Sequence, residues 1–220
     1  MLQLVSTADS SHTLFNEELN ETYHSKHGAI AESLHVFIKA GLQFVLDKNI
    51  TNEIHILEIG FGTGLNALLT FKETEKSKRK IIYDSLEAFP LSKDISEKLN
   101  YGELLEQQLI FNKLHFCNWD SPEVISDNFV LNKISTSVQC FVQYKQYNLI
   151  YFDAFAPSKQ PEMWTQEIFD KMFSILKPSG TLVTYCAKGE VKRNLKASGF
   201  TIESLPGPKG KREMTRATKP

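Results

Sequence analysis

The chain has 220 residues, of which 41% are hydrophobic and 23% are charged. This length and composition are typical of one globular domain with a sizeable core, and internal repeats and low-complexity tracts are absent. No apolar run reaches the 18 or more residues of a membrane span, and the N-terminus lacks a basic segment followed by an apolar one. We therefore expect a soluble, cytoplasmic protein.

The charge is unevenly distributed, although the net charge is only −1. The segment 188–220 carries nine lysines and arginines against three glutamates, so it has a net charge of +6 and the rest of the chain −7. Such a basic segment suits a polyanion partner, but a solvated charged surface is the commoner explanation. The three cysteines and six histidines lack C-x-x-C and H-E-x-x-H spacing, so we predict neither a disulfide framework nor a metal site.

The predicted elements alternate between strands and helices from about residue 53 onward, as in a parallel α/β sheet. Before them, the first 50 residues are predicted to form a hairpin and then a helix over 28–46. In chain order we then predict a strand over 53–60, a helix from 64, a strand over 80–87, a helix and a strand near 129–134, a strand over 147–155, a helix over 161–180 that begins with proline, a strand over 181–186, a helix over 189–199, and paired strands over 201–206 and 212–218.

This order predicts a mostly parallel, seven-stranded α/β sheet that ends in an antiparallel C-terminal hairpin. No stretch rich in proline, glycine and serine separates one part of the chain from another. We therefore expect a single domain over 1–220, in which residues 1–50 form a small N-terminal extension and residues 51–220 form the core.

A glycine-rich turn follows the first strand of the predicted core. In "LEIGFGTGLN" the glycines have the spacing G-x-G-x-G, whereas a dinucleotide-binding turn would place its third glycine at the position of Leu65. Such a turn lets a ligand approach the backbone closely and directs helix N–H groups at it. Acidic residues stand two positions before the turn, at Glu58, and at the end of the next strand, at Glu87.

This combination resembles the class I S-adenosylmethionine-dependent methyltransferases, which have a Rossmann-like fold. The resemblance implies that Glu58 lies near the methionine part of the cofactor and that Glu87 accepts hydrogen bonds from both ribose hydroxyls. Many such enzymes place an acidic or amide residue beside adenine, and the corresponding segment 132–139 has no acidic residue, so its candidates are Asn132, two serines, Thr136 and Gln139. The candidate cofactor-binding residues are Glu58, Gly60, Gly62, Gly64, Asn66 and Glu87.

A second carboxylate ends the apolar strand over 147–155. In "YFDAFAPSKQPEMW", Asp153 should emerge at the carboxyl ends of the strands, where ligands bind in such sheets. Methyl transfer to an amine needs the neutral amine, and a carboxylate can hold the amine and help remove its proton. Phe155 could stack on a planar ring, and Pro157 would stiffen the loop. The alternative is an aspartate that merely caps the following turn.

Longer segments resemble a narrower family, the methyltransferase domain of the bifunctional tRNA 5-methylaminomethyl-2-thiouridine biosynthesis (MnmC) proteins. They include "ELNETYHSKHGAIAESLHVFIKAGL", "LEAFPL", "DAFAPSKQPEMW" and "GKREM", and together they cover most of the chain. The resemblance implies N-methylation of the primary amine of 5-aminomethyl-(2-thio)uridine at the tRNA wobble position. It covers only methyl transfer, because the sequence ends at Pro220 without a flavin-dependent oxidase domain. The aminomethyl group would then come either from a separate oxidase or from direct synthesis by upstream enzymes.

The same resemblance assigns the substrate site. Asp153 would be the catalytic carboxylate, and Phe155 and Pro157 would shape the base pocket. The charge of the basic tail fits contacts with the phosphates of the anticodon stem-loop beside this pocket, although a surface hairpin without a partner would look similar. The candidate substrate-binding residues are Glu32, Phe155, Pro157, Lys159, Trp164, Lys211 and Arg212.

Two other functions are compatible with these residues. The first is methylation of a small-molecule amine by the same fold, which would need neither a basic tail nor salt-sensitive binding. The second is a non-catalytic RNA-binding or partner protein, because a fold does not imply a function. The presence of Glu87 and Asp153 together with the complete glycine turn argues against the second.

Overall fold

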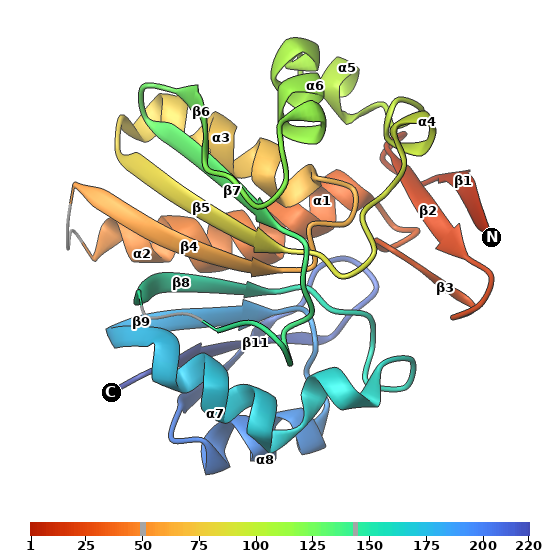
Figure 1. Cartoon of the computed structure of the whole chain (residues 1–220). Helices are drawn as coiled ribbons and strands as arrows, with labels where there is room; N and C mark the ends of the chain where they lie inside the picture. Colours follow the sequence, from red (N-terminus) through yellow and green to blue (C-terminus); the bar gives the residue numbers. More distant parts are fainter. Residues whose placement is uncertain (49–51, 143–144) are drawn as a thin grey trace.

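A large sheet between two layers of helices forms the centre of the protein (Figure 1). The computed structural model describes residues 1–48, 52–142 and 145–220. Within these residues the sheet has eight strands, in the order β10 (Thr201–Pro206), β11 (Glu213–Thr218), β9 (Leu176–Thr184), β8 (Tyr147–Phe152), β4 (Glu53–Ile59), β5 (Lys80–Leu86), β7 (Phe129–Ile134) and β6 (Glu123–Ser126). The mostly parallel sheet with an antiparallel C-terminal hairpin is confirmed, with one strand more than predicted.

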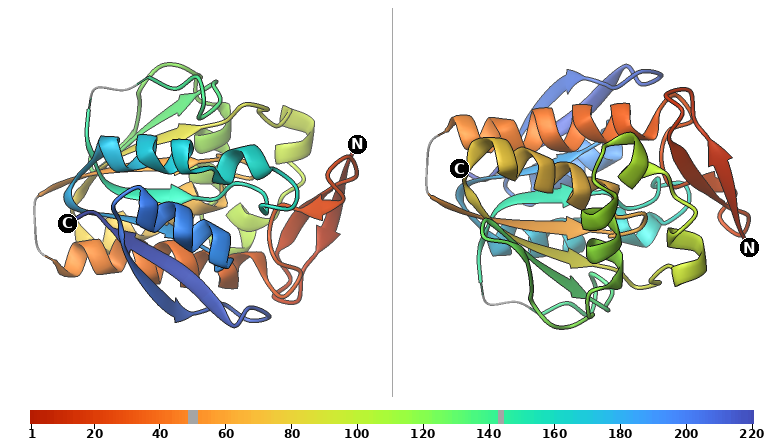
Figure 2. Two further views of the ribbon diagram at one scale, coloured as in Figure 1. Left: turned by 90° about the horizontal axis from the view of Figure 1, so that it is seen from below. Right: turned by 90° about the horizontal axis from the view of Figure 1, so that it is seen from above.

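Helices cover both faces of this sheet (Figure 2). One face carries the continuous helix α1 (Ala29–Ser33), η1 (Leu34–Gln43) and α2 (Phe44–Asp47), together with α3 (Leu65–Ser77) and α6 (Gln108–Phe116). The opposite face carries α7 (Gln166–Ile175) and α8 (Gly189–Ala197). Two short helices, α4 (Lys93–Ser96) and α5 (Tyr101–Leu104), precede α6.

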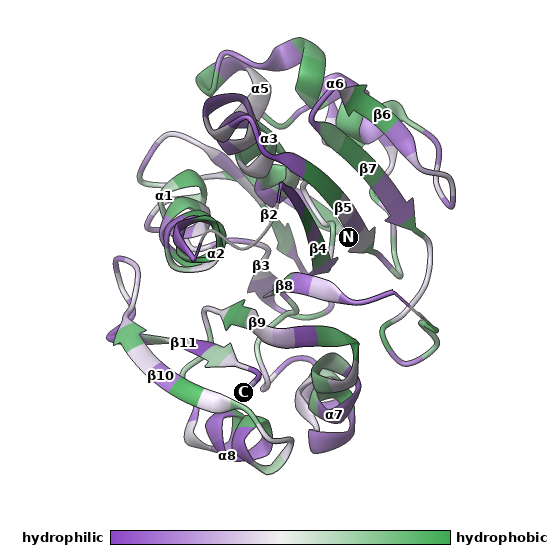
Figure 3. Cartoon of the chain, turned by 90° about the vertical axis from the view of Figure 1, so that its left-hand side faces the viewer, coloured by the Kyte–Doolittle hydropathy of each residue, from purple (hydrophilic) through white to green (hydrophobic). Residues whose placement is uncertain are grey.

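The central strands are apolar on both sides because helices cover both of their faces. In β4, Ile56 belongs to the cluster with α3 and η1, whereas Leu57 belongs to the cluster with α7 and α8, and both side chains are fully buried. Every residue of β8 is buried. Figure 3 shows green, hydrophobic stretches in β5 and β7, with purple, hydrophilic residues toward their ends. The hydrophobic effect therefore fixes the central strands from both sides.

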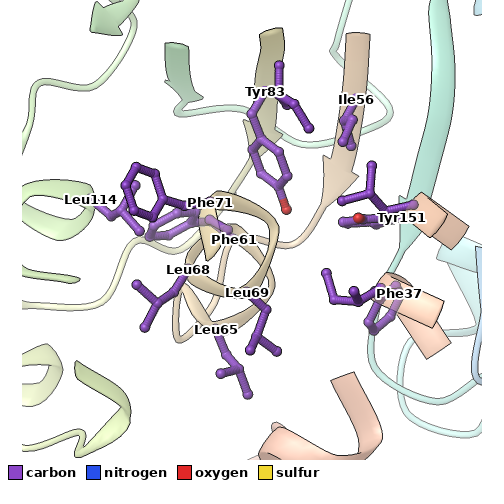
Figure 4. Packing of buried hydrophobic residues seen from close by; sticks show 14 of the residues in the cluster. Phe37, Ile56, Phe61, Leu65, Leu68, Leu69, Phe71, Tyr83, Leu114 and Tyr151 are labelled. Carbon is purple, nitrogen blue, oxygen red and sulfur yellow. The ribbon is translucent and has the colours of Figure 1, made fainter. Parts of the chain in front are cut away.

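The long helix over Ala29–Asp47 packs against the first face of the sheet. Phe37 of this helix contacts Tyr151 of β8, and the centroids of the two rings lie 5.2 Å apart (Figure 4). Gly41 permits this close packing, because a Cβ atom there would lie 2.9 Å from Val183. Among the described residues, this is the one helix whose length and apolar composition would suit a membrane span. Its apolar side chains instead contribute to the core.

The N-terminal residues form a second, smaller sheet. Strands β1 (Leu2–Ser6), β2 (His12–Asn16) and β3 (Glu21–Thr22) pair in antiparallel fashion, so the predicted hairpin gains a third strand. Figure 1 shows this sheet beyond the arrowheads of β4 and β5, which are the carboxyl ends of the central strands. The extension therefore covers the edge at which ligands bind in parallel sheets.

The order of the central strands creates a crevice at that edge. The chain proceeds from β4 to β5 and β7 on one side of β4, and then returns to β8 and β9 on the other side. The connections after β4 and β8 therefore leave the sheet in opposite directions. This is the topological switch point, where ligands bind in open α/β sheets.

The predicted helix over 161–180 begins and ends elsewhere than expected, and its last residues belong to β9, which starts at Leu176 instead of at residue 181. The segment η2 (Pro161–Trp164) is a 3₁₀ turn, and α7 begins only after Thr165, whose hydroxyl accepts a hydrogen bond from the Ile168 amide at 3.4 Å. Thr165 is thus the N-cap, a signal stronger than the proline before it. The additional strand, β6, has four residues and pairs only with β7, at the edge of the sheet. Most of its side chains are not buried, so its sequence lacks the apolar pattern of a buried strand.

The buried face of η1 provides a test of this packing. Leu42→Ala should lower the free energy of unfolding by about 2 to 5 kcal/mol, because the fully buried side chain would leave a cavity. The matched control is Leu34→Ala in the same helix, where the side chain is 42% exposed. Urea denaturation should show a change below about 1 kcal/mol for this control, and equal losses for the two variants would contradict the packing described here.

Candidate functional site

The glycine turn connects β4 to α3 at the switch point. Gly60, Gly62 and Gly64 have φ values of 93°, 48° and 71°, in the left-handed region that favours glycine. The Gly60 amide donates to the Leu86 carbonyl at 2.9 Å, which ties the turn to the end of β5. A side chain at Gly62 would lie 3.2 Å from the ring of Tyr23. The turn is therefore a tight backbone surface that only glycine can form.

Glu87 follows β5 and lies beside the glycine turn. One carboxylate oxygen, Oε2, accepts a hydrogen bond from the Gly62 amide at 2.8 Å, and the other, Oε1, accepts one from the Phe89 amide at 2.8 Å. A carboxylate has about four acceptor positions, so Glu87 can accept further hydrogen bonds from a ligand. Its position is fixed by the backbone on both sides.

Asp153 follows β8 on the other side of the same crevice. Its Oδ2 atom accepts a hydrogen bond from Asn66 Nδ2 at 2.8 Å. The pKa of Asp153 is raised to about 7, chiefly by burial and also by the negative charge of Glu32, whereas the hydrogen bond from Asn66 and the charge of Lys211 oppose this rise. A carboxylate with such a pKa can exchange a proton near neutral pH.

Glu32 and Lys211 form an ion pair in the same cavity. Lys211 Nζ lies 2.7 Å from Glu32 Oε1 and 3.7 Å from the centroid of the Tyr185 ring. The second oxygen of Glu32 accepts a hydrogen bond from the Ser25 amide at 2.8 Å. The site thus combines two carboxylates, one ammonium group and one aromatic face.

The loop after β8 is held by its own side chains. The indole Nε1 of Trp164 donates to the Phe155 carbonyl at 2.8 Å, and the Phe155 amide donates to Gln160 Oε1 at 3.2 Å. The Phe155 ring meets the edge of Tyr23, with ring centroids 4.9 Å apart. Trp164 itself is buried at 3% exposure, so it supports the loop from behind.

Two histidines hold the tip of the glycine turn at Thr63. His24 Nε2 lies 2.7 Å from the Thr63 hydroxyl, and His115 Nε2 lies 3.0 Å from the Thr63 carbonyl. Burial lowers the pKa of each histidine to about 4, so both rings are neutral at physiological pH. A neutral ring can contact the turn without bringing a positive charge into the core.

Glu58 lies behind the cavity and is completely buried. Its Oε2 atom accepts a hydrogen bond from the Ser85 hydroxyl at 2.6 Å, while Oε1 has no hydrogen-bond partner among the described residues. Burial raises the pKa of Glu58 to about 8, with the Ser85 hydrogen bond opposing and the Asp153 charge adding to this rise. Glu58 is therefore mostly protonated at neutral pH.

These groups surround one cavity of about 1090 Å³. Of the predicted site residues, those that line it are Glu32, Gly60, Gly62, Asn66, Glu87, Asp153, Phe155 and Lys211. Within the described part of the chain, the predicted residues outside its lining are Glu58, Gly64, Pro157, Lys159, Trp164 and Arg212. The binding roles of all these residues stay predictions, but Lys211 faces the cavity, whereas Arg212 is exposed.

Several lining residues were not singled out in the sequence. Tyr185 directly follows β9, so its place at the carboxyl end of a strand could have identified it. Tyr23 belongs to the N-terminal extension, and no local pattern indicates that it reaches the glycine turn. The segment 136–139, expected near adenine, also lines the cavity. In the described residues, no three His, Cys, Asp or Glu side chains gather as metal ligands.

Comparison with known proteins gives the family. A family model described as S-adenosyl-L-methionine-dependent methyltransferase matches residues 101–220. The bifunctional tRNA 5-methylaminomethyl-2-thiouridine biosynthesis protein MnmC of Leptospira interrogans is 33% identical over 226 residues, which cover 92% of this chain. The corresponding protein of Campylobacter hominis is 29% identical over 208 residues, which cover 93% of this chain. The chain spans about a third of the length of these relatives, 33% and 31% respectively.

A solved structure supports the same grouping. The crystal structure of MNMC2 from Aquifex aeolicus matches 100% of this chain and 72% of its own chain, with a TM-score of 0.78 and 26% sequence identity. The match includes the N-terminal extension as well as the central sheet, because it covers the entire chain. The chain belongs to the S-adenosyl-L-methionine-dependent methyltransferases, and among them it is similar to the methyltransferase part of the MnmC proteins.

Proposed function

We propose that the protein methylates the primary amine of 5-aminomethyluridine, or of its 2-thio form, at the wobble position of tRNA in the cytoplasm. The product would be 5-methylaminomethyl-(2-thio)uridine. The whole chain would act as one catalytic domain on the anticodon stem-loop, and an upstream enzyme would supply the aminomethyl group. The names of the relatives support this proposal, and the geometry around Asp153 carries it.

The glycine turn and Glu87 suit the cofactor of this family. Glu87 holds the turn through the Gly62 amide and retains acceptor positions for two ribose hydroxyls. Asn66 lines the cavity, and its Oδ1 atom is buried and has no partner within the described residues. S-adenosylmethionine supplies a methyl group on a positively charged sulfur, and its C–S bond breaks as the N–C bond forms.

The position of Asp153 is the observation that favours an amine substrate. A primary amine is mostly an ammonium ion at pH 7 and has no free lone pair in that form. A carboxylate whose pKa burial raises to about 7 can accept a hydrogen bond from the ammonium ion and then its proton. Asp153 also fixes the direction of the amine, because Asn66 holds its Oδ2 atom.

Aromatic residues on the cavity wall suit a planar base. Phe155 and Tyr23 line the cavity next to the glycine turn, and their rings meet edge to face. A base removed from an anticodon loop can stack on such a ring. The cavity volume of about 1090 Å³ is at the upper end for ligand pockets, which supports a site for a cofactor and a nucleoside together.

The deciding experiment is transfer of a radiolabelled methyl group from S-adenosylmethionine to tRNA that bears 5-aminomethyluridine. The matched control is the same tRNA without the aminomethyl group, and nucleoside mass spectrometry identifies the product. We expect label only on the aminomethyl nucleoside. Cofactor binding without label on either tRNA would overturn the proposal and favour a small-molecule amine as substrate.

Replacing the carboxylate should separate catalysis from binding. Asp153→Asn should reduce single-turnover methyl transfer by about 10²-fold, because the amide cannot accept the proton. Cofactor affinity, measured by calorimetry, should change little. In the wild-type protein the rate should decrease as pH falls below about 7, since the pKa of Asp153 is raised by burial. An unchanged single-turnover rate in the variant would exclude Asp153 from catalysis.

Protein stability provides the control for this variant. Burial raises the pKa of Asp153 from its ordinary value of 3.8 to about 7, so the folded protein binds this proton more tightly than the unfolded chain. The wild-type protein therefore loses stability as pH rises between these values. Asp153→Asn, which stays neutral, should be the more stable protein at pH 8 and should lose activity without losing its fold.

Glu87 should determine cofactor affinity. Glu87→Ala should weaken the binding of S-adenosylmethionine by about 1.5 to 3 kcal/mol, because charged hydrogen bonds are lost. The matched control is Glu162→Ala, which removes another carboxylate from the cavity wall, in η2. Isothermal titration calorimetry should show a small effect for the control, and equal affinities of Glu87→Ala and wild type would refute the ribose assignment.

A further inference from the structure

The ammonium group of Lys211 lies inside the cavity. Its Nζ atom contacts Glu32 Oε1 at 2.7 Å and the face of the Tyr185 ring at 3.7 Å, and all three residues line the cavity. The neighbouring Arg212 is exposed to solvent instead. An ammonium group on an aromatic face and beside a carboxylate is held by both interactions. The positive charge of Lys211 therefore lies in the same cavity as Asp153.

The turn between β10 and β11 keeps this charge in place. The Lys211 amide donates to the Pro208 carbonyl at 2.9 Å, and His35 Nε2 lies 2.8 Å from the Pro206 carbonyl. The ring of His27 packs so closely on Gly210 that a Cβ atom there would lie 2.3 Å from it. The N-terminal extension thus holds the turn from outside, and little freedom remains to be lost when substrate binds.

Three charges then meet where the amine would bind. Asp153, Glu32 and Lys211 all line the cavity, and both Glu32 and Lys211 act electrostatically on Asp153. Fully ionised, the three groups carry one net negative charge, which matches the single positive charge of an aminomethyl group. Without Lys211 the site would carry two negative charges and would stabilise the unreactive ammonium ion.

His24 and Tyr185 interact electrostatically with this trio, but burial keeps both of them neutral. Burial keeps His24 neutral by lowering its pKa to about 4, and burial keeps Tyr23 neutral by raising its pKa to about 12. Tyr185 also stays neutral, because burial raises its pKa, whereas Glu58 lies behind the cavity and interacts electrostatically with Asp153. The remaining ionisable groups of the lining are the N-terminal amino group of Met1 and the side chains of Glu18, Glu21, Lys26, His27, Glu87 and Glu162.

We propose that Lys211 is a positioning residue which, balanced by Glu32, sets the pH at which the substrate amine becomes neutral. This inference rests on the proposed function. The ammonium ion gives one proton to the Asp153 carboxylate. The lone pair of the neutral amine would then form the N–C bond to the methyl group, while the C–S bond breaks and the electron pair of that bond stays on sulfur. A nearby cation favours the neutral amine, as it does for catalytic lysines.

Variants of opposite charge test this balance. The pH dependence of single-turnover methyl transfer should shift to higher pH by about one unit in Lys211→Met, because the site becomes more negative. It should shift to lower pH in Glu32→Gln, because the site becomes more positive. The double variant should return close to the wild-type midpoint, since the two missing charges cancel. Equal midpoints in all four proteins would overturn the inference.

Arg212→Met is the matched control. It removes an exposed positive charge next to Lys211, so it should alter the KM for tRNA and its salt dependence while leaving the pH midpoint unchanged. If Lys211→Met behaves in the same way, Lys211 binds phosphates and the inference is wrong. If the wild-type protein transfers no label to tRNA that bears 5-aminomethyluridine, the proposed function itself is wrong. Failure of the proposed function can therefore be distinguished from failure of the inference about Lys211.

A measurement without substrate covers the case in which a variant loses activity through a structural change. The pKa of the Asp153 carboxyl can be followed by ¹³C NMR in the free protein. It should rise in Lys211→Met and fall in Glu32→Gln, because the first loses a positive neighbour and the second a negative one. An unaltered Asp153 titration in both variants would also overturn the inference.

Discussion

The burial of β8 on both faces is the constraint on which the site depends. β8 lies between two layers of helices and carries no carboxylate over Tyr147–Phe152, and Asp153 lies just beyond its last residue. Water only partly solvates this position, and burial raises the pKa of Asp153 to about 7. The hydrogen bond from Asn66 compensates in part and fixes the direction of the carboxylate. The same packing that stabilises the sheet therefore produces a group suited to proton transfer.

The carboxyl ends of the neighbouring strands β4 and β5 also carry residues of the candidate cofactor site. The glycine turn follows β4, and Glu87 follows β5 and accepts a hydrogen bond from the Gly62 amide of the turn. Thr63 at the tip of the turn is held by two neutral histidines from distant parts of the chain. The backbone surface for a cofactor is thus rigid before any ligand arrives, which reduces the entropy lost on binding.

Periodicity in the sequence predicted most of the core, because apolar alternation reports on burial within a single element. The strand β7 over Phe129–Ile134 agrees with its predicted range for this reason. The extra strand β6 pairs only at the edge of the sheet and carries no such pattern. The helix predicted from Pro161 begins instead after Thr165, because the cap at Thr165 prevails over the proline. Contacts of the N-terminal extension with the glycine turn had no local signal at all.

The sequence by itself determined the order of strands and helices, the glycine turn, and the places of Glu87 and Asp153 at strand ends. These features depend on residues close together in the chain. Only the tertiary structure decided that Lys211, 179 residues after Glu32, turns into the cavity and pairs with it. It also decided that Glu58 is enclosed behind the site and that burial raises its pKa. Pairing and protonation depend on how much water and which charges packing leaves around a group, and packing brings together residues that the sequence keeps far apart.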